Sequence, residues 1–458
     1  MRLYKYIICF LIIASLAIPV MAVKLPQSAY LKSAKIALAD TKSPRLDEAM
    51  MLLDSAVFYY GAIPEALFLR GNIYAEMAAK NPNLQKKIEF FKLMSDNYDS
   101  LTAACNNPEI KKDLKKDCRR MSDLCDSVRV KYWSEYYNEG VKGIEKIDKE
   151  LSPKVKDAAD QASADAAGQE LNNFADSAKY FFMVASTVDN KDYRAYEGVG
   201  LIYDRLKNLD SSLVWLVKSM EHAQDTTSHL ILNIAYAYIQ KNEYQKAIEY
   251  FGKYLKLVPN DANNIFNVAI CYSNLQEFDS SLHYDKLTMA VDSTIPGPYI
   301  DAGQNYLLRS QKVSDSIKFY AQQNKTEEAK HFTKMRDAIL DTSASYFEVA
   351  SRLDPSNVMV LEQYAVAKLV AGHYAEAGEI YKKLTEVEPD RGNNWLSLGD
   401  IYVQQQKLKE AVPAYEKATE LNPGDGEVWK VLKDLYHNLN MPEKEKIADE
   451  KLNELGKM

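Results

Sequence analysis

The sequence lacks the local motifs that mark common catalytic and cofactor sites. The patterns G-x-x-x-x-G-K-[ST], G-x-G-x-x-G, H-E-x-x-H and G-x-S-x-G are all absent. The six histidines stand singly, and none has the spacing at which one helix face offers two imidazoles to a metal. The two cysteines of CRRMSDLC have the wrong spacing for a zinc knuckle or a redox C-x-x-C. We therefore predict no cofactor, no metal site and no catalytic residues.

A basic excess and a second long apolar run are also absent. The chain has 57 Lys and Arg against 64 Asp and Glu, a net charge of −7. A nucleic-acid partner is not predicted, because phosphate contacts require a basic surface. The one apolar run, from Ile7 to Ile18, follows basic residues and precedes Val20-x-Ala22, which is typical of a cleaved secretory signal peptide. We expect an exported protein, periplasmic or outer-membrane-associated in a bacterium, without a stable membrane span after cleavage.

Four cysteines remain after the leader, and the sequence leaves their state open. Cys118 and Cys125 would be roughly 10 Å apart on one straight helix, which is too far for a disulfide. Cys105 precedes the turn NNPE and is the better partner for either, if the chain bends there. The alternative is that the cysteines are small buried thiols, which is our interpretation of Cys271.

A regular spacing of large and small residues begins near the C-terminus, in NNWLSLGDIYVQQQKLKEAVPAYEKATELNPGD. Gly399 lies on the first predicted helix and leaves room for a neighbouring helix to approach closely. Pro423 has no backbone N–H to donate, so it ends the second helix. Three large residues share one face of the first helix: Trp395, Leu398 and Tyr402. Three residues form the apolar stripe of the second helix: Ala411, Tyr415 and Ala418.

The same arrangement recurs with a period of about 34 residues, in units that open near residues 193, 228, 262, 296, 358 and 392, with 28 additional residues between the openings at 296 and 358. It resembles the tetratricopeptide repeat, a helix–turn–helix unit of this length. A terminal unit with Trp429, Leu432 and Tyr436 has a charged second helix, as a capping repeat requires. The resemblance implies an all-α fold: an α-solenoid of tetratricopeptide helix–turn–helix repeats with helical insertions.

Irregularities in the pattern suggest how the chain is divided. We predict a signal peptide at 1–22, a degenerate repeat-like helical region at 23–150, and an Ala/Asp/Lys-rich insertion or linker at 151–172. A repeat array follows at 173–440, with a helical insertion at about 311–340, and a capping helix at 441–458. In the unit that opens at 262, Asp285 takes the place of the second-helix aromatic residue. Stacking of the N-terminal third on the array and the oligomeric state are left open.

The resemblance also implies a groove lined by the first helices, in which a partner peptide binds. Side-chain amides pair with the backbone of an extended peptide whatever its sequence. A similar asparagine ladder occurs in some peptide-binding members of the family. The predicted groove residues are the polar sixth residues of five units: Asn233, Asn267, Asp301, Gln363 and Ser397. A cationic carboxylate clamp is not predicted, because the preceding positions carry Leu232, Phe266, Ile300, Glu362 and Leu396.

The predicted function is therefore a non-catalytic exported scaffold that binds proteins or extended peptides for cell-envelope assembly or secretion. One alternative is a binder of cell-envelope polymer or glycan that uses aromatic and carboxamide groups of the same groove. Another is an enzyme whose site lies in the inserted regions near 143–172 and 311–340. The five groove residues have a second interpretation as polar residues at the wet edge of the groove.

Overall fold

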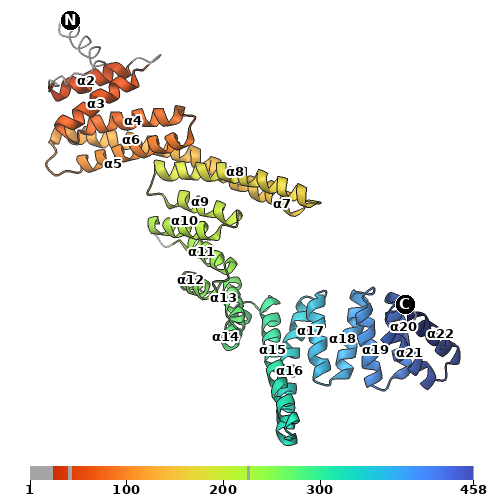
Figure 1. Cartoon of the computed structure of the whole chain (residues 1–458). Coiled ribbons are helices and arrows are strands. Elements are labelled where there is room, and N and C mark those ends of the chain that lie inside the picture. Colours follow the sequence, from red (N-terminus) through yellow and green to blue (C-terminus); the bar gives the residue numbers. More distant parts are fainter. Residues whose placement is uncertain (1–23, 40–43, 224–226, 457–458) are drawn as a thin grey trace. The chain divides into compact units, whose positions relative to one another are not determined.

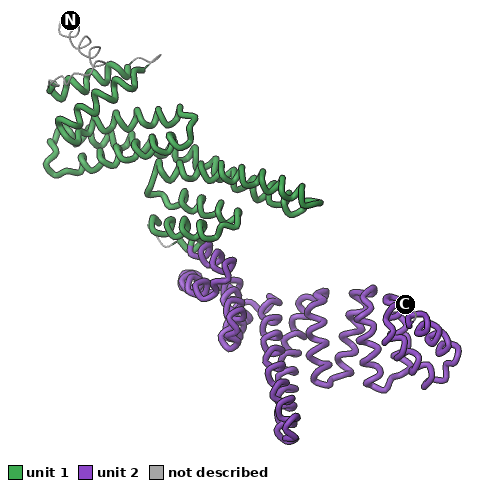
Figure 2. Tube along the Cα trace, in the orientation of Figure 1, with its two compact units in different colours: residues 1–230 green, residues 231–458 purple. Residues whose placement is uncertain are grey.

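The computed structural model describes residues 24–39, 44–223 and 227–456. Every regular element in these ranges is a helix, and they contain no strand, so the predicted all-α class is confirmed. The leader predicted at 1–22 lies outside the described residues. The chain divides into two compact units, residues 1–230 (unit 1) and 231–458 (unit 2), shown in Figure 2. The boundary falls within α11 (Ser228–Gln240).

Unit 1 is a succession of helices joined by short connections (Figure 1). Helix α2 packs on α3, α4 on α5 and α9 on α10, whereas α6 pairs with α8. The elements before α11 are α2 (Gln27–Leu38), α3 (Leu46–Tyr60), α4 (Pro64–Lys80), α5 (Leu84–Cys105), α6 (Lys112–Lys146), the π-helical turn η1 (Ile147–Leu151), α7 (Ser152–Lys156), α8 (Gln161–Val188), α9 (Tyr193–Arg205) and α10 (Leu209–His222).

The N-terminal helices of unit 1 pack on the helices that follow them. One buried apolar cluster contains Phe91 and Tyr98 from α5, Tyr136 from α6 and Val184 from α8. Further along, the buried ring of Phe182 lies against Gly140 of α6 and Gly198 of α9. A Cβ atom at either glycine would lie less than 3 Å from that ring. The N-terminal helices are therefore continuous with the rest of unit 1.

The Ala/Asp/Lys-rich segment at 151–172 is helical except for a turn at residues 157–160. It comprises the last residue of η1, all of α7 and the first turns of α8. Ile147 and Leu151 of η1 are buried in a cluster with Ala175 and Ala178 of α8. Most of the segment itself remains exposed. It therefore extends the α6–α8 pair beyond the cluster that anchors it.

Cys105 and Cys118 form a disulfide, with their Cα atoms 5.6 Å apart. Cys105 is the last residue of α5 and Cys118 lies near the start of α6, so the turn at NNPE brings them together. Cys118 and Cys125 both lie on α6, which agrees with the prediction that these two cysteines do not form a disulfide with each other. Cys125 and Cys271 are buried free thiols.

Unit 2 contains helices of nearly constant length, apart from one long pair (Figure 1). The first helix of most repeats has 13 residues and the second has 14. After α11 the elements are α12 (Tyr244–Leu257), α13 (Ala262–Asn274), α14 (Phe278–Val291), α15 (Gly297–Gln322), α16 (Thr326–Leu353), α17 (Val358–Val370), α18 (Tyr374–Val387), α19 (Gly392–Gln404), α20 (Leu408–Leu421), α21 (Gly426–Asn438) and α22 (Pro442–Leu455).

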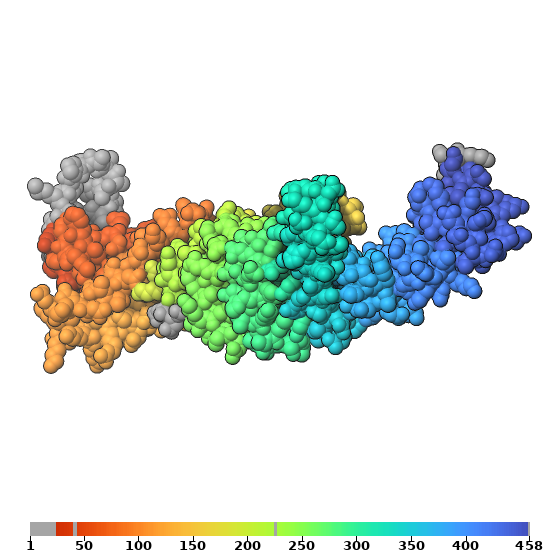
Figure 3. Space-filling view, turned by 90° about the horizontal axis from the view of Figure 1, so that it is seen from below, coloured from red at the N-terminus to blue at the C-terminus, as the bar shows by residue number. Residues whose placement is uncertain are grey.

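The predicted insertion at 311–340 lengthens two helices of one repeat. Residues up to Gln322 continue α15, and residues from Thr326 begin α16. The lengthened hairpin stands out from the helices that follow it (Figure 3). Near its tip, the rings of Tyr320 and Phe332 stack at 5.2 Å. No residue from 311 to 339 is fully buried. In this part of the hairpin the two helices therefore pack only on each other, and no third helix covers them.

The packing role predicted for Gly399 is confirmed in the α19–α20 pair. A Cβ atom at Gly399 would lie 3.0 Å from the buried ring of Tyr415. The α15–α16 pair has the same arrangement, with Gly303 against Phe347 at 2.8 Å. Each aromatic ring thus fills the space that the missing glycine side chain leaves, which brings the two helices close together.

Candidate functional site

The first helices α17, α19 and α21 have equal lengths and begin 34 residues apart. Residues at equal positions in successive helices therefore form rows across the surface of unit 2. The ninth-position row consists of Val366, Asp400 and Asp434. The row thus has an apolar side chain on α17, followed by a carboxylate on α19 and another on α21.

Helix α17 exposes apolar side chains on one face. Met359, Val366 and Val370 are 49%, 38% and 46% exposed. Their spacings of seven and four residues place them on one side of the helix, together with Gln363. The opposite side is buried in the repeat core, through Val360, Leu361, Ala365 and Ala367. We call Met359, Gln363, Val366 and Val370 the α17 stripe; the packing of the repeat does not use it.

The five predicted groove residues lie in different local environments. Asn267 Nδ2 donates to the Tyr236 hydroxyl at 3.2 Å and to Asn264 Oδ1 at 3.0 Å. Asp301 Oδ2 accepts from Ser281 Oγ at 2.7 Å and from Asn305 Nδ2 at 3.1 Å. Both residues therefore already belong to hydrogen-bond networks within the repeat, so a backbone partner would compete with these contacts.

The other three predicted residues, Asn233, Gln363 and Ser397, are partly buried. Gln363 lies in the α17 stripe, and within the described chain its Oε1 is buried without a hydrogen-bond partner. A buried carbonyl oxygen without a donor is costly, so a rotation of the Gln363 carboxamide toward a donor of an incoming peptide would remove that cost. The structure thus gives Gln363 the clearest capacity for a new hydrogen bond, and the ladder as a whole remains a prediction.

Asp400 is held in place by a buried tyrosine. The Tyr415 hydroxyl donates to Asp400 Oδ1 at 2.5 Å. Burial raises the pKa of Tyr415 well above its ordinary value, and its hydrogen bond to the Asp400 carboxylate raises it further. Asp400 itself is exposed and forms no ion pair within the described ranges. Its carboxylate is therefore oriented by the protein and still accessible to a cation.

A second carboxylate of unit 2 has the opposite environment. Asp285, at the aromatic position of α14, is fully buried, and no group within the described chain donates a hydrogen bond to either of its oxygens. When it is protonated, the carboxyl group itself can donate a hydrogen bond to Asp301. Burial raises the pKa of Asp285 to about 9, and the nearby Asp301 carboxylate adds to the increase. At neutral pH Asp285 is therefore a protonated, uncharged side chain. This explains how the core accepts it in place of an aromatic residue.

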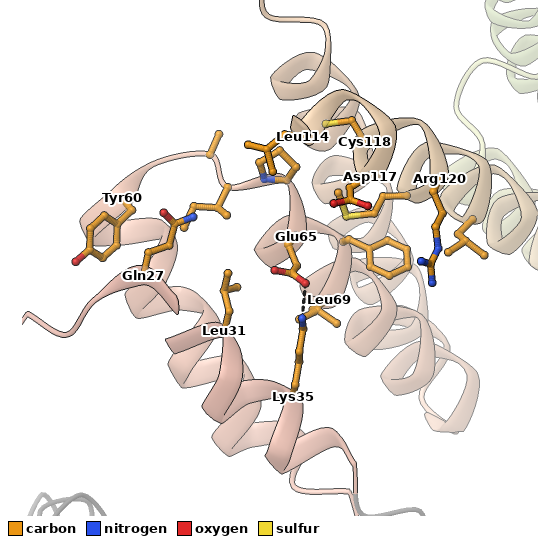
Figure 4. Close-up of a pocket in the computed structure, with 16 residues that line it drawn as sticks. Gln27, Leu31, Lys35, Tyr60, Glu65, Leu69, Leu114, Asp117, Cys118 and Arg120 are labelled. Carbon is orange, nitrogen blue, oxygen red and sulfur yellow. Dashed lines mark ion pairs between the residues drawn. The ribbon is translucent and has the colours of Figure 1, made fainter. Parts of the chain in front are cut away.

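Unit 1 contains a cavity of about 590 Å³ between α2, α4 and α6 (Figure 4). Its walls include Leu31, Leu69 and Leu114, and an ion pair joins Lys35 of α2 to Glu65 of α4. The helices that form it are far apart in the sequence, in the region where the repeat pattern is weakest. No motif indicated this cavity. For the α17 stripe the sequence did contain a signal, since the apolar residues at 359, 366 and 370 share a helix face with the predicted groove residue Gln363.

One aromatic cluster of unit 1, around Trp133, is engaged with other side chains. Trp133 stacks on Tyr137 at 4.5 Å, and the guanidinium of Arg194 lies 4.4 Å from the Trp133 ring centre. Arg194 in turn is bound by the Asp192 carboxylate. Trp133 and Tyr137 thus serve in packing, and this cluster offers a sugar ring no open aromatic platform.

The described residues contain no cluster of three or more His, Cys, Asp or Glu side chains that could hold a metal ion. Among the same residues, no helix combines the length and apolar character needed to cross a bilayer.

Two segments match family models described as "Tetratricopeptide repeat": residues 229–261 and residues 393–425. The first spans α11 and α12, and the second spans α19 and α20, so each match covers one helix pair of the 34-residue period. The chain is a tetratricopeptide-repeat protein. Proteins of this family are generally non-catalytic scaffolds with extended binding surfaces, so this tetratricopeptide-repeat protein belongs to the broad class of protein-interaction scaffolds.

The chain is similar to several proteins whose descriptions name this repeat. The TPR repeat-containing protein MJ0263 of Methanocaldococcus jannaschii is 41% identical over 56 residues, which are 12% of this chain and 18% of that protein. A tetratricopeptide repeat protein from Parabacteroides merdae is 17% identical, with a TM-score of 0.36, over 66% of this chain and 99% of that one. The C-terminal part of a TPR repeat-containing protein from Cytophaga hutchinsonii is 15% identical, with a TM-score of 0.41, over 57% and 95%.

Proposed function

We propose that this tetratricopeptide-repeat protein is an exported scaffold that binds extended segments of other proteins on the first-helix surface of unit 2. The observation that carries the proposal is the α17 stripe, where Met359, Val366 and Val370 remain exposed beside the half-buried Gln363. Apolar side chains gathered on one exposed face favour contact with a partner, because that contact removes them from water. The same surface offers a carboxamide for backbone pairing.

Export is part of the proposal. The sequence of the leader supports it, and so does the Cys105–Cys118 disulfide, since such bonds persist in oxidising compartments. An exported scaffold would act on other envelope or secreted proteins, and we place its role in cell-envelope assembly or secretion. Fractionation of the native cells tests this part, because recovery of the uncleaved chain in the cytoplasm would contradict export.

Crosslinking in the native cells, followed by mass spectrometry of captured proteins, tests the binding surface. The test variant is Met359→Ser with Val370→Ser, and the matched control is Val214→Ser, an exposed valine on α10 of unit 1. We expect specific proteins to be captured by the wild type and the control and lost in the double variant. Equal capture by all three would contradict binding at the α17 stripe.

A second double variant, Asn233→Ala with Asn267→Ala, tests the predicted ladder separately. Loss of the same partners, with unchanged helicity, would assign the ladder a binding role. Unchanged capture would mean that these carboxamides serve the repeat itself, as the hydrogen bonds of Asn267 to Asn264 and Tyr236 suggest.

A further inference from the structure

The ninth-position row has an anionic end. Next to Val366 of the α17 stripe, the equivalent residues of α19 and α21 are Asp400 and Asp434, both exposed. No Lys, Arg or His side chain forms an ion pair with either of them in the ranges that the structure describes. An occupant that crosses this row therefore meets an apolar side chain first and then two carboxylates.

The cations near this row are already engaged. Arg391, which precedes α19, pairs with Glu362 at 2.6 Å and with Glu388 at 3.0 Å. On α21, Lys430 pairs with Glu427 at 2.6 Å. Lys433 of the same helix pairs with Asp449 of α22 at 2.6 Å. Lys433 also attracts the Asp434 carboxylate more weakly. The nearby cations therefore leave Asp400, and to a smaller extent Asp434, as the charges that an occupant would meet.

The Asp400 carboxylate is also oriented before any partner arrives. Tyr415 is 1% exposed, and its hydroxyl fixes Oδ1 of Asp400. One carboxylate oxygen is thus occupied by the protein, while the second oxygen retains acceptor capacity. Pre-orientation reduces the entropy that is lost when a Lys or Arg side chain binds, so it favours a cationic partner at this position.

We propose that the occupant of this surface is a peptide segment with apolar side chains close to one or more Lys or Arg residues. Its apolar side chains lie on the α17 stripe, and its cationic side chains lie at Asp400 and Asp434. The proposal rests on the proposed function, since it names the chemistry of the partner that the scaffold binds. Apolar contact supplies affinity, and the two carboxylates supply selectivity by repelling acidic segments.

A random-peptide phage library, selected on the immobilised full chain, is the probe. Selected peptides are synthesised with a fluorophore, and their affinities are measured by fluorescence anisotropy. The test variants are Asp400→Lys and Val366→Ser with Val370→Ser. The charge-matched control is Glu410→Lys, an exposed acid of the second helix α20, and circular dichroism verifies that each variant remains folded.

We expect the selected peptides to combine apolar residues with Lys or Arg. We expect Asp400→Lys to weaken binding about tenfold or more and Glu410→Lys to leave it within about twofold. Replacing the basic residue of a selected peptide by Glu should restore binding to Asp400→Lys. A structural effect of the substitution could not produce that reciprocal rescue.

Two results would overturn the inference in different ways. Peptides that require Val366 and Val370, but that are acidic or uncharged and insensitive to Asp400→Lys, would refute the basic partner and leave the proposed function intact. If no selected peptide is weakened by Val366→Ser with Val370→Ser, the binding surface itself is wrong, and the proposed function fails with the inference.

Discussion

The Tyr415 hydroxyl donates a 2.5 Å hydrogen bond to Asp400 Oδ1, while the ring of the same tyrosine packs against Gly399. Tyr415 of α20 therefore contacts two adjacent residues of α19, Gly399 through its ring and Asp400 through its hydroxyl. The ring fixes the distance between the two helices of the repeat. The hydroxyl fixes a carboxylate on the exposed face of α19, so the packing of the core determines the geometry of the candidate binding surface.

Tyr415→Phe separates these two contributions. The phenyl ring can still pack against Gly399, whereas the hydrogen bond to Asp400 is lost. We expect the free energy of unfolding to fall by about 1 kcal/mol, measured by urea denaturation and far-UV circular dichroism. In a double-mutant cycle with Asp400→Asn, the losses should be less than additive, because both substitutions disrupt the same contact. Strictly additive losses would show that the hydrogen bond contributes nothing to stability.

Gly71 provides a sharper test of close helix approach. A Cβ atom there would lie 2.2 Å from the ring of the fully buried Tyr98. We expect Gly71→Ala to reduce the free energy of unfolding by about 1–3 kcal/mol through overpacking. The matched control is Gly168→Ala on α8, where a Cβ would have no neighbour within 4 Å. That control should be neutral or stabilising by up to about 1 kcal/mol. Equal effects of the two substitutions would contradict the packing assignment.

The repeat fold was predictable from the sequence because its constraints are local. Gly399 and Tyr415 are 16 positions apart, and the equivalent residues Gly303 and Phe347 make the same contact in the α15–α16 pair, so the repeat pattern shows it. Asp285 also departed visibly from the pattern, but its environment depends on Asp301 in another helix. A sequence pattern does not show how close the carboxyl groups of Asp285 and Asp301 lie, so the protonated state of Asp285 could be inferred only from the structure.

The candidate site was predictable only in part. The period identified which positions face the groove, and it placed Gln363 among them. It did not show that Asn267 and Asp301 are bound within the repeat, because those hydrogen bonds depend on side-chain directions. The cavity of unit 1 was beyond prediction for another reason: α2 and α6 meet there without a shared repeat register.

The Cys105–Cys118 disulfide should stabilise unit 1 by restricting the unfolded chain. For a closed loop of this length the chain-entropy estimate is about 3 kcal/mol. We expect Cys105→Ala with Cys118→Ala to increase hydrogen exchange of α5 and α6 in unit 1, and to leave α17–α21 of unit 2 unchanged. A reducing agent should reproduce this pattern in the wild type and have no further effect on the double variant. Unchanged exchange of α5 and α6 would show that the bond does not stabilise this region.

The remaining cysteines should be unreactive in the folded chain. Burial raises the pKa values of Cys125 and Cys271 to about 12, so the nucleophilic thiolate is scarce at neutral pH. We expect iodoacetamide to modify neither residue at pH 7.5 until the protein is unfolded, as measured by mass spectrometry of the alkylated chain. Rapid modification of Cys271 in the native protein would show that unit 2 opens at that position far more often than its packing allows.

Asp285 should make the stability of unit 2 decrease as the pH rises. Its pKa is about 9 in the folded chain, because the carboxyl is buried and faces Asp301 of α15, and it is about 4 when unfolded. Tyr346 of α16 is the other titratable group coupled to it, and the pKa of Tyr346 is itself raised, mainly by burial. Between these two pH values the folded state binds a proton that the unfolded state has released, so each pH unit lowers the free energy of unfolding by up to about 1.4 kcal/mol.

The variant Asp285→Asn isolates this contribution, because the amide has nearly the same shape and does not titrate. The difference in free energy of unfolding between Asp285→Asn and the wild type should grow in favour of the variant from pH 5 to pH 8. Urea denaturation of both proteins at each pH measures this difference and cancels the contributions of other ionisable groups. A difference that stays constant with pH would show that Asp285 is ionised in the folded protein, and that the core tolerates a buried charge at the aromatic position of α14.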